Sequence, residues 1–215
     1  MSVTASAAML GALVVLGLPP ALARVEAAGL QVSLGAVRAR AGGFVSDSAK
    51  LRAVAPGFRG AAELRFEYLG PTADQAPLAS GEMRRQVGLK LNAESGCNVV
   101  YVMWRIDPVP GLVVSVKENP GQRLHAECGT RGYRNVRPAS ARPAPALVPG
   151  SRHALRAELT GRELAVWIDG EPVWEGPVAD GPLEFDGPVG VRADNARIDW
   201  ELWGRTGSGP ASRSP

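Results

Sequence analysis

The sequence predicts an all-β protein, a sandwich of two antiparallel sheets. Hydrophobic residues recur at a period of two from Leu30 to Trp203, and no stretch in this range keeps a helical period for three turns. Glycine and proline, 26 and 18 of 215 residues, separate the short apolar runs. We expect roughly ten to twelve strands, which suits a single two-sheet domain of this length.

The N-terminal segment predicts export. Residues 1–23 carry no charge, and residues 7–18 are almost wholly apolar before the small-residue triplet Ala21-Leu22-Ala23. This pattern is typical of a cleaved signal peptide comprising residues 1–23, and it predicts a secreted, periplasmic or extracellular location. Because no Lys or Arg precedes the apolar run, a retained N-terminal anchor stays open as the alternative.

The first strands are predicted from alternation. From Ala62 to Tyr68 every second residue is apolar, and a segment from Met83 to Leu91 repeats this pattern. The run from Cys97 to Ile106 is apolar on both faces. We expect a central strand there, or the lining of a concave cleft.

The middle of the chain is less regular. Residues 112–117 predict a strand after the proline-rich turn 107–111, and residues 123–128 predict a weaker strand. Four prolines between Gly129 and Gly150 predict a long surface connection.

Two hairpins and a final strand pair are expected near the C-terminus. The turns are Thr160-Gly161-Arg162 and Asp169-Gly170. The last pair joins residues 188–192 to residues 196–203, and one face of the second strand presents Ala196, Ile198, Trp200 and Leu202. The sandwich domain thus covers residues 24–203, and the polar residues 204–215 are expected to form a disordered tail.

Two cysteines offer a covalent link. An exported protein meets oxidising conditions, so Cys97 and Cys128 are expected to form a disulfide. Two buried free thiols are the alternative.

A family resemblance appears in the C-terminal third. The blocks HALRAELTGRELAVWIDGEPVWEG and GPVGVRADNARIDWELW resemble the closing strands of concanavalin A-like jelly rolls, including laminin-G-like and 3-keto-disaccharide hydrolase-like domains. The matching residues are Trp167-Ile168-Asp169-Gly170 and Gly187-Pro188-Val189-Gly190-Val191-Arg192. The resemblance implies a jelly-roll sandwich and leaves the activity open.

The resemblance implies three possible functions. The first is a non-catalytic carbohydrate-binding or surface-recognition module. The second is a glycan hydrolase with a non-standard site, because Glu184-Phe185-Asp186 lacks the third carboxylate of the glycosidase motif. Glu82, Asp107 and Glu127 are its unranked carboxylate candidates. The third is a protein-interaction domain of the laminin-G-like kind.

Aromatic and arginine side chains are the predicted ligand contacts, because flat rings stack on sugars and guanidinium groups donate paired hydrogen bonds. Trp104 and Trp174 are candidate platforms, and Tyr101 and Arg105 share the other face of the central strand. The loops flanking the expected disulfide add Arg123, Arg131, Tyr133 and Arg134.

Charge and composition limit the classes of binding partner that the sequence predicts. The net charge is +3, but the 21 Arg and 3 Lys are scattered, which argues against a nucleic-acid partner. A glycan or another exported protein is expected instead, with no stable membrane span after cleavage. No cofactor and no metal site are predicted. A zinc site from His125, Cys128 and either Cys97 or His153 would compete with the disulfide for the cysteines, and no loop concentrates calcium ligands.

Overall fold

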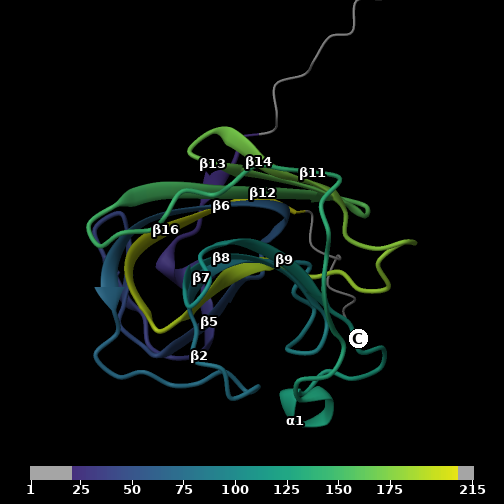
Figure 1. The fold of residues 1–215 in the computed structure, drawn as a ribbon, viewed down its shortest axis with the longest axis horizontal. Coiled ribbons are helices and arrows are strands. Elements are labelled where there is room, and N and C mark those ends of the chain that lie inside the picture. Colours follow the sequence, from purple (N-terminus) through teal and green to yellow (C-terminus); the bar gives the residue numbers. More distant parts are fainter. Residues whose placement is uncertain (1–20, 208–215) are drawn as a thin grey trace, which may run out of the picture.

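The structure is a computed structural model that describes residues 21–207. The predicted signal peptide falls almost entirely outside these residues, as do residues 208–215 of the predicted tail. Two antiparallel sheets face each other (Figure 1), with β6, β12 and β16 in one layer and β5, β7, β8 and β9 in the other. The predicted two-sheet antiparallel sandwich is confirmed.

Nine strands form the first sheet. In spatial order they are β11 (Ser140–Ala141), β14 (Glu171–Pro177), β13 (Glu163–Ile168), β12 (Arg152–Thr160), β6 (Phe58–Pro71), β16 (Ala196–Thr206), β4 (Gly43–Ser46) and β3 (Arg38–Arg40), with β1 (Ala23–Arg24) beside β16.

Seven strands form the second sheet. In spatial order they are β10 (Tyr133–Asn135), β9 (Gly111–Lys117), β8 (Val99–Asp107), β7 (Arg85–Leu91), β15 (Val189–Asp194), β5 (Lys50–Ala55) and β2 (Gln31–Leu34). The helical elements among the described residues are a 3-10 turn, Ala27–Gly29, and α1, His125–Cys128.

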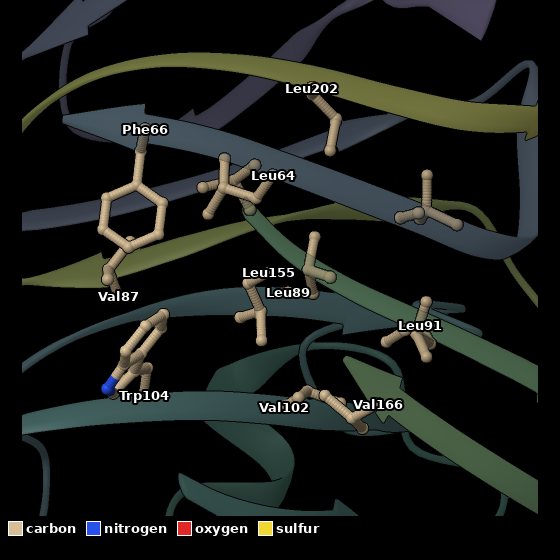
Figure 2. Close-up of a cluster of buried hydrophobic side chains, with 14 of the residues drawn as sticks. Leu64, Phe66, Val87, Leu89, Leu91, Val102, Trp104, Leu155, Val166 and Leu202 are labelled. Atoms are coloured by element: carbon tan, nitrogen blue, oxygen red, sulfur yellow. The ribbon is translucent and has the colours of Figure 1, made fainter. Parts of the chain in front are cut away.

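The core lies between the sheets. Leu64 and Leu202 from the nine-stranded sheet meet Leu89 and Val102 from the seven-stranded sheet, and all four are fully buried (Figure 2). At one end of the cluster the rings of Phe66 and Trp104 pack edge to face, 6.0 Å between centroids. Because alternate residues of each strand enter this layer, the remaining residues point outward from the sandwich.

Several predicted elements are confirmed. The central strand is β8, which lies between β7 and β9. The turn Asp169-Gly170 joins β13 to β14 as a two-residue hairpin in which both residues have positive φ, 53° and 88°. This geometry matches the right-handed twist of the two strands, and it explains the preference for an Asp-Gly pair.

Three local predictions are wrong. Residues 125–128 form α1 instead of a strand, because the Glu127 carboxylate accepts hydrogen bonds from the backbone N–H groups of Arg123 and Leu124 and closes a tight turn. The stretch 129–150 contains β10 and β11, two short edge strands. Met83 precedes β7 and is exposed.

The predicted final strand pair is also wrong in its pairing. β15 pairs with β5 and β7, whereas β16 pairs with β6 in the other sheet. Asn195, with φ of 54°, turns the chain from one sheet to the other. The predicted core face of β16 is nevertheless confirmed, since the side chains of all four residues are buried: Ala196, Ile198, Trp200 and Leu202.

The last strand runs past the predicted domain end at residue 203. β16 continues to Thr206, which pairs with Phe58. A side chain at position 204 would collide with the Phe58 ring at 2.8 Å, so Gly204 lets this ring pack against the strand. Residues 21–207 contain 16 strands, more than the ten to twelve expected, because the additional ones are short strands of two to four residues at or next to the sheet edges.

Candidate functional site

The outer face of the seven-stranded sheet is the candidate site. Leu51, Leu89, Val102, Val116 and Val191 point into the core, so their neighbours along each strand point outward. The outward side chains include a set of charged and polar groups: Lys50, Arg52, Gln86, Lys90, Tyr101, Lys117, Tyr133, Arg192 and Asp194. We call this set the basic face. In Figure 1, α1 lies beyond this sheet, on the side away from the nine-stranded sheet.

Asp194 organises the charges of the basic face. Its fully buried carboxylate accepts hydrogen bonds from Arg52 at 2.6 Å, Gln86 at 2.7 Å and Arg192 at 2.9 Å. Burial opposes ionisation, but the charges of Arg192 and Arg52 outweigh it, so the pKa of Asp194 is lowered. The carboxylate is therefore ionised and fully occupied by its three partners.

Arg192 also binds two tyrosines. Its guanidinium lies over the ring of Tyr101, 4.8 Å from the centroid, and Nη1 donates to the hydroxyl of Tyr133 at 3.5 Å. The rings of Tyr101 and Tyr133 stack at 6.0 Å between centroids. Tyr101 is buried, which raises the pKa of its hydroxyl to about 12, whereas Tyr133 is 44% exposed. Tyr133 therefore offers the accessible ring on this face.

Two buried lysines on this face, Lys117 and Lys90, differ in their hydrogen-bond partners. Lys117 is fully buried, and its Nζ donates to the carbonyls of Gly96 at 2.9 Å and Gly129 at 2.7 Å and contacts Cys128 Sγ at 3.1 Å. Lys90 is 7% exposed, and its Nζ has no hydrogen bond or ion pair with any described residue. Burial lowers the pKa of Lys90 to about 8, and repulsion from Arg52 and Arg192 contributes.

A disulfide fixes the segment beside this face. Cys97 and Cys128 are bonded, with their Cα atoms 5.8 Å apart, which confirms the predicted pairing. Asn119 reinforces it, because its Nδ2 donates to the carbonyls of Cys97 and Arg131 at 3.1 Å each. The bond thus anchors the chain between β9 and β10, which delivers Tyr133 to the face.

The helix α1 lies within the field of the same cations. Burial lowers the pKa of His125, and the charges of Lys117, Arg52, Arg192 and Lys50 lower it further. The basic face therefore repels a positive charge placed at the start of α1.

The structure brings two predicted site residues together and disperses four others. Tyr101 and Tyr133 form the stack described above. Arg105 shares the outward side of β8 with Tyr101, but its Nε is buried without a partner among the described residues. The remaining arginines have local roles: Arg123 pairs with Glu94, Arg131 donates to the Glu127 carbonyl, and Arg134 pairs with Glu118.

The two tryptophans singled out as platforms are core residues. Trp104 is fully buried, and its indole N–H donates to the Pro145 carbonyl at 3.0 Å. Trp174 is 4% exposed and belongs to the same core. Neither ring is accessible to a ligand, because β8 and β14 turn these positions inward, so this prediction is corrected. Partly exposed rings occur instead at Trp167 and Trp203, on the outer face of the nine-stranded sheet.

Sequence analysis missed most of the basic face. Of its charged residues, Arg192 belongs to the fold motif and Asp194 is one of the scattered oxygen ligands considered for calcium, whereas Arg52, Lys90 and Lys117 are not among the predicted contacts. One feature of the composition points to this face. The chain has 21 Arg and only 3 Lys, and all three lysines (Lys50, Lys90 and Lys117) lie on this one face.

A second polar site lies on the nine-stranded sheet. A hollow of about 660 Å³ is lined by several acidic and basic side chains. Each acid there already has a partner. Glu67 pairs with Arg152 at 2.8 Å, Asp169 with His153 at 2.7 Å, and Asp199 with Arg40. Glu201 accepts a hydrogen bond from the Trp203 indole N–H at 3.1 Å. The outer surface of this sheet is therefore a network of ion pairs.

Within residues 21–207 no group of three or more His, Cys, Asp or Glu side chains is arranged to hold a metal ion. No helix of this part of the chain is long and apolar enough to cross a membrane.

Solved structures with the same architecture include glycan-binding and glycan-processing proteins. The carbohydrate-binding module CBM66 from Bacillus subtilis is 12% identical, with 80% of this chain and 91% of that chain covered and a TM-score of 0.55. The ligand-free Crh5 transglycosylase is 11% identical, with 86% and 81% covered and a TM-score of 0.52. No protein-family model matches the chain, and no curated protein matches it in sequence.

The fold is a two-sheet jelly-roll sandwich like that of these structures. At these identities the likeness establishes the fold alone. The fold-level resemblance noted in the C-terminal blocks is confirmed, and the function has to be argued from the site.

Proposed function

We propose that the protein is an exported, non-catalytic recognition module that binds a glycan on the basic face. The observation that carries this proposal is the half-exposed ring of Tyr133, held against Tyr101 and Arg192 beside buried polar groups. An aromatic ring next to hydrogen-bonding groups suits a sugar, whose ring face is apolar and whose hydroxyls are polar. The carbohydrate-binding module among the structural neighbours supports the same class of ligand.

The location of the protein is part of this proposal. The predicted signal peptide favours export, and the Cys97–Cys128 disulfide is typical of an oxidising compartment. Glycans of cell surfaces and of the surrounding medium are accessible there.

Catalysis receives less support. A general acid in glycoside hydrolysis needs a raised pKa. Two candidate carboxylates show the opposite shift: hydrogen bonding to Arg84 lowers the pKa of Glu82, and the N–H groups of Leu124 and Arg123 lower that of Glu127. The segment 184–186 lies outside the strands. We therefore place recognition ahead of hydrolysis.

Binding of the full chain to a broad array of glycans and polysaccharides, with and without calcium, tests the proposal. Tyr133→Ala is expected to weaken binding at least tenfold, because it removes the accessible ring. Trp167→Ala is the matched control, since it removes a partly exposed ring from the other sheet and is expected to leave binding unchanged. Loss of binding in the Trp167 variant alone would move the site to the nine-stranded sheet. Absence of binding to every glycan would overturn the proposal and favour a protein partner, to be sought by pull-down.

A further inference from the structure

The basic face has a large excess of positive charge. Five cationic side chains point outward from four strands of this sheet, β5, β7, β9 and β15: Lys50, Arg52, Lys90, Lys117 and Arg192. Asp194 is the one carboxylate among the outward residues of these four strands. The groups act on one another, since Arg52 and Arg192 both lower the pKa of Lys90. Like charges held this close repel, so the arrangement is unfavourable in the absence of an anion.

The internal carboxylate does not neutralise this excess. Asp194 is fully buried and already accepts from Arg52, Gln86 and Arg192. Lys117 needs no anion, because two backbone carbonyls and the disulfide sulfur surround its ammonium group. Lys50 is partly exposed to solvent, so the charge that remains uncompensated among the buried side chains is that of Lys90.

Lys90 occupies the middle of the face. On β7 it lies opposite Tyr101 of β8 on one side and opposite Gly190 of β15 on the other. Gly190 has no side chain, so β15 places no side chain next to Lys90 at this paired position. The amide oxygen of Gln86, two outward positions away on the same strand, is also buried without a partner among the described residues.

An unpaired buried ammonium group is costly, and Gln or Met would fill the same position without that cost. We propose that the glycan recognised here is acidic, and that Lys90 binds the oxyanion of its carboxylate or sulfate group. This inference rests on the proposed function and specifies its ligand class. The ring of Tyr133 then contacts the sugar, and Lys90 selects the charged unit.

Matched ligand pairs test the inference. The full chain is titrated with oligogalacturonate and with its methyl ester, which differ in charge, and with dextran sulfate and dextran. We expect at least tenfold tighter binding to the acidic member of one pair or both. The first pair identifies a carboxylate ligand, and the second identifies a sulfate.

Three variants attribute the effect to one side chain. Lys90→Gln is expected to weaken binding of the acidic ligand at least tenfold and to leave the neutral ligand unaffected, whereas Lys90→Arg retains most of the affinity. Arg142→Gln is the matched control. It removes the same charge from an exposed position next to β11 in the other sheet, and it is expected to change affinity less than twofold at 150 mM salt.

Several results would overturn the inference. Equal binding of both members of each pair would leave glycan recognition standing and remove the acidic specificity. Equal losses in Lys90→Gln and Arg142→Gln, or equal affinity for a DNA duplex, would indicate a response to net charge alone. Unchanged affinity in Lys90→Gln would exclude Lys90 as the contact, and failure of every glycan to bind would overturn the proposed function as well.

Discussion

Lys90 is the residue whose surroundings suit its charge least. Its side chain is largely buried, the charges of Arg52 and Arg192 repel its ammonium group, and its pKa is lowered to about 8 from an ordinary value of 10.5. The unfolded chain keeps the ordinary value, so between pH 8 and pH 10.5 the unfolded state holds more protons than the folded one. Stability therefore rises with pH across this window, and the penalty is fully present below pH 8.

The direction of this pH dependence gives the first prediction at the residue scale. Lys90→Met should stabilise the ligand-free protein at pH 7 by up to about 3 kcal/mol, the equivalent of the pKa difference. The advantage should shrink as the pH rises above 8 and be nearly gone by about pH 10.5, where the lysine is neutral in the folded state and half deprotonated in the unfolded state. Urea unfolding of both proteins at pH 7 and pH 10 measures it, with Arg142→Met as the control. A destabilised Lys90→Met variant at pH 7 would mean that the amine has a partner that stabilises the fold.

At the scale of elements, the segment 118–132 depends on the disulfide. It contains one short helix, α1, and its apolar contribution to the core is small: Cys128 is buried, whereas Leu124 is exposed. The bond spans 31 residues, and loop-closure entropy of that length corresponds to about 3 to 4 kcal/mol. This segment leads into β10, so its order determines the position of Tyr133.

We therefore predict that replacing both cysteines by serine lowers the melting temperature under non-reducing conditions. The wild-type protein should fall to a similar value when a reductant is present, while the variant should not respond. Calorimetry with and without dithiothreitol makes the comparison. Two titratable thiols in the native protein would contradict the prediction.

The strands were predictable because their signal is local. Alternation placed β6 and the core side of β16, a continuous apolar run placed β8, and turn residues placed β9 and the hairpin at Asp169-Gly170. The helix α1 was not predictable, since it depends on a disulfide and on a carboxylate that binds neighbouring N–H groups. The partners of β15 and β16 were also beyond periodicity, because one residue, Asn195, switches sheets.

The site was harder to predict than the fold for a physical reason. Alternation assigns residues to two faces but does not say which face is the core. For β8 this choice separates Tyr101 from Trp104, and the larger ring went to the interior. The hydrogen bonds to Asp194 join β5, β7 and β15, which are distant in sequence, so no short sequence motif reveals this network.

At the scale of the whole molecule, one core joins both sheets. Leu64 lies in this core and is fully buried (Figure 2). Leu64→Ala should lower the free energy of unfolding by about 2 to 5 kcal/mol, through lost burial and the cavity left behind. Because the sheets share the core, tryptophan fluorescence and far-UV circular dichroism should report one transition.

Leu34→Ala is the matched control for that measurement, since Leu34 lies on the edge strand β2 and is 48% exposed. Its effect should stay within about 0.5 kcal/mol. Two separate transitions in the Leu64 variant would show that the sheets unfold independently.

The distribution of lysines gives the protein a natural chemical label. All three side-chain amines lie on the basic face: Lys50, Lys90 and Lys117. Reagents that acylate amines leave guanidinium groups intact, so the side chains they modify belong to this sheet. Lys117 is fully buried with its ammonium group already bound, so native labelling is expected at Lys50 and Lys90. A fluorophore attached in this way reports on the binding surface without any engineered cysteine, and protection by a ligand can be followed by mass spectrometry at these two positions.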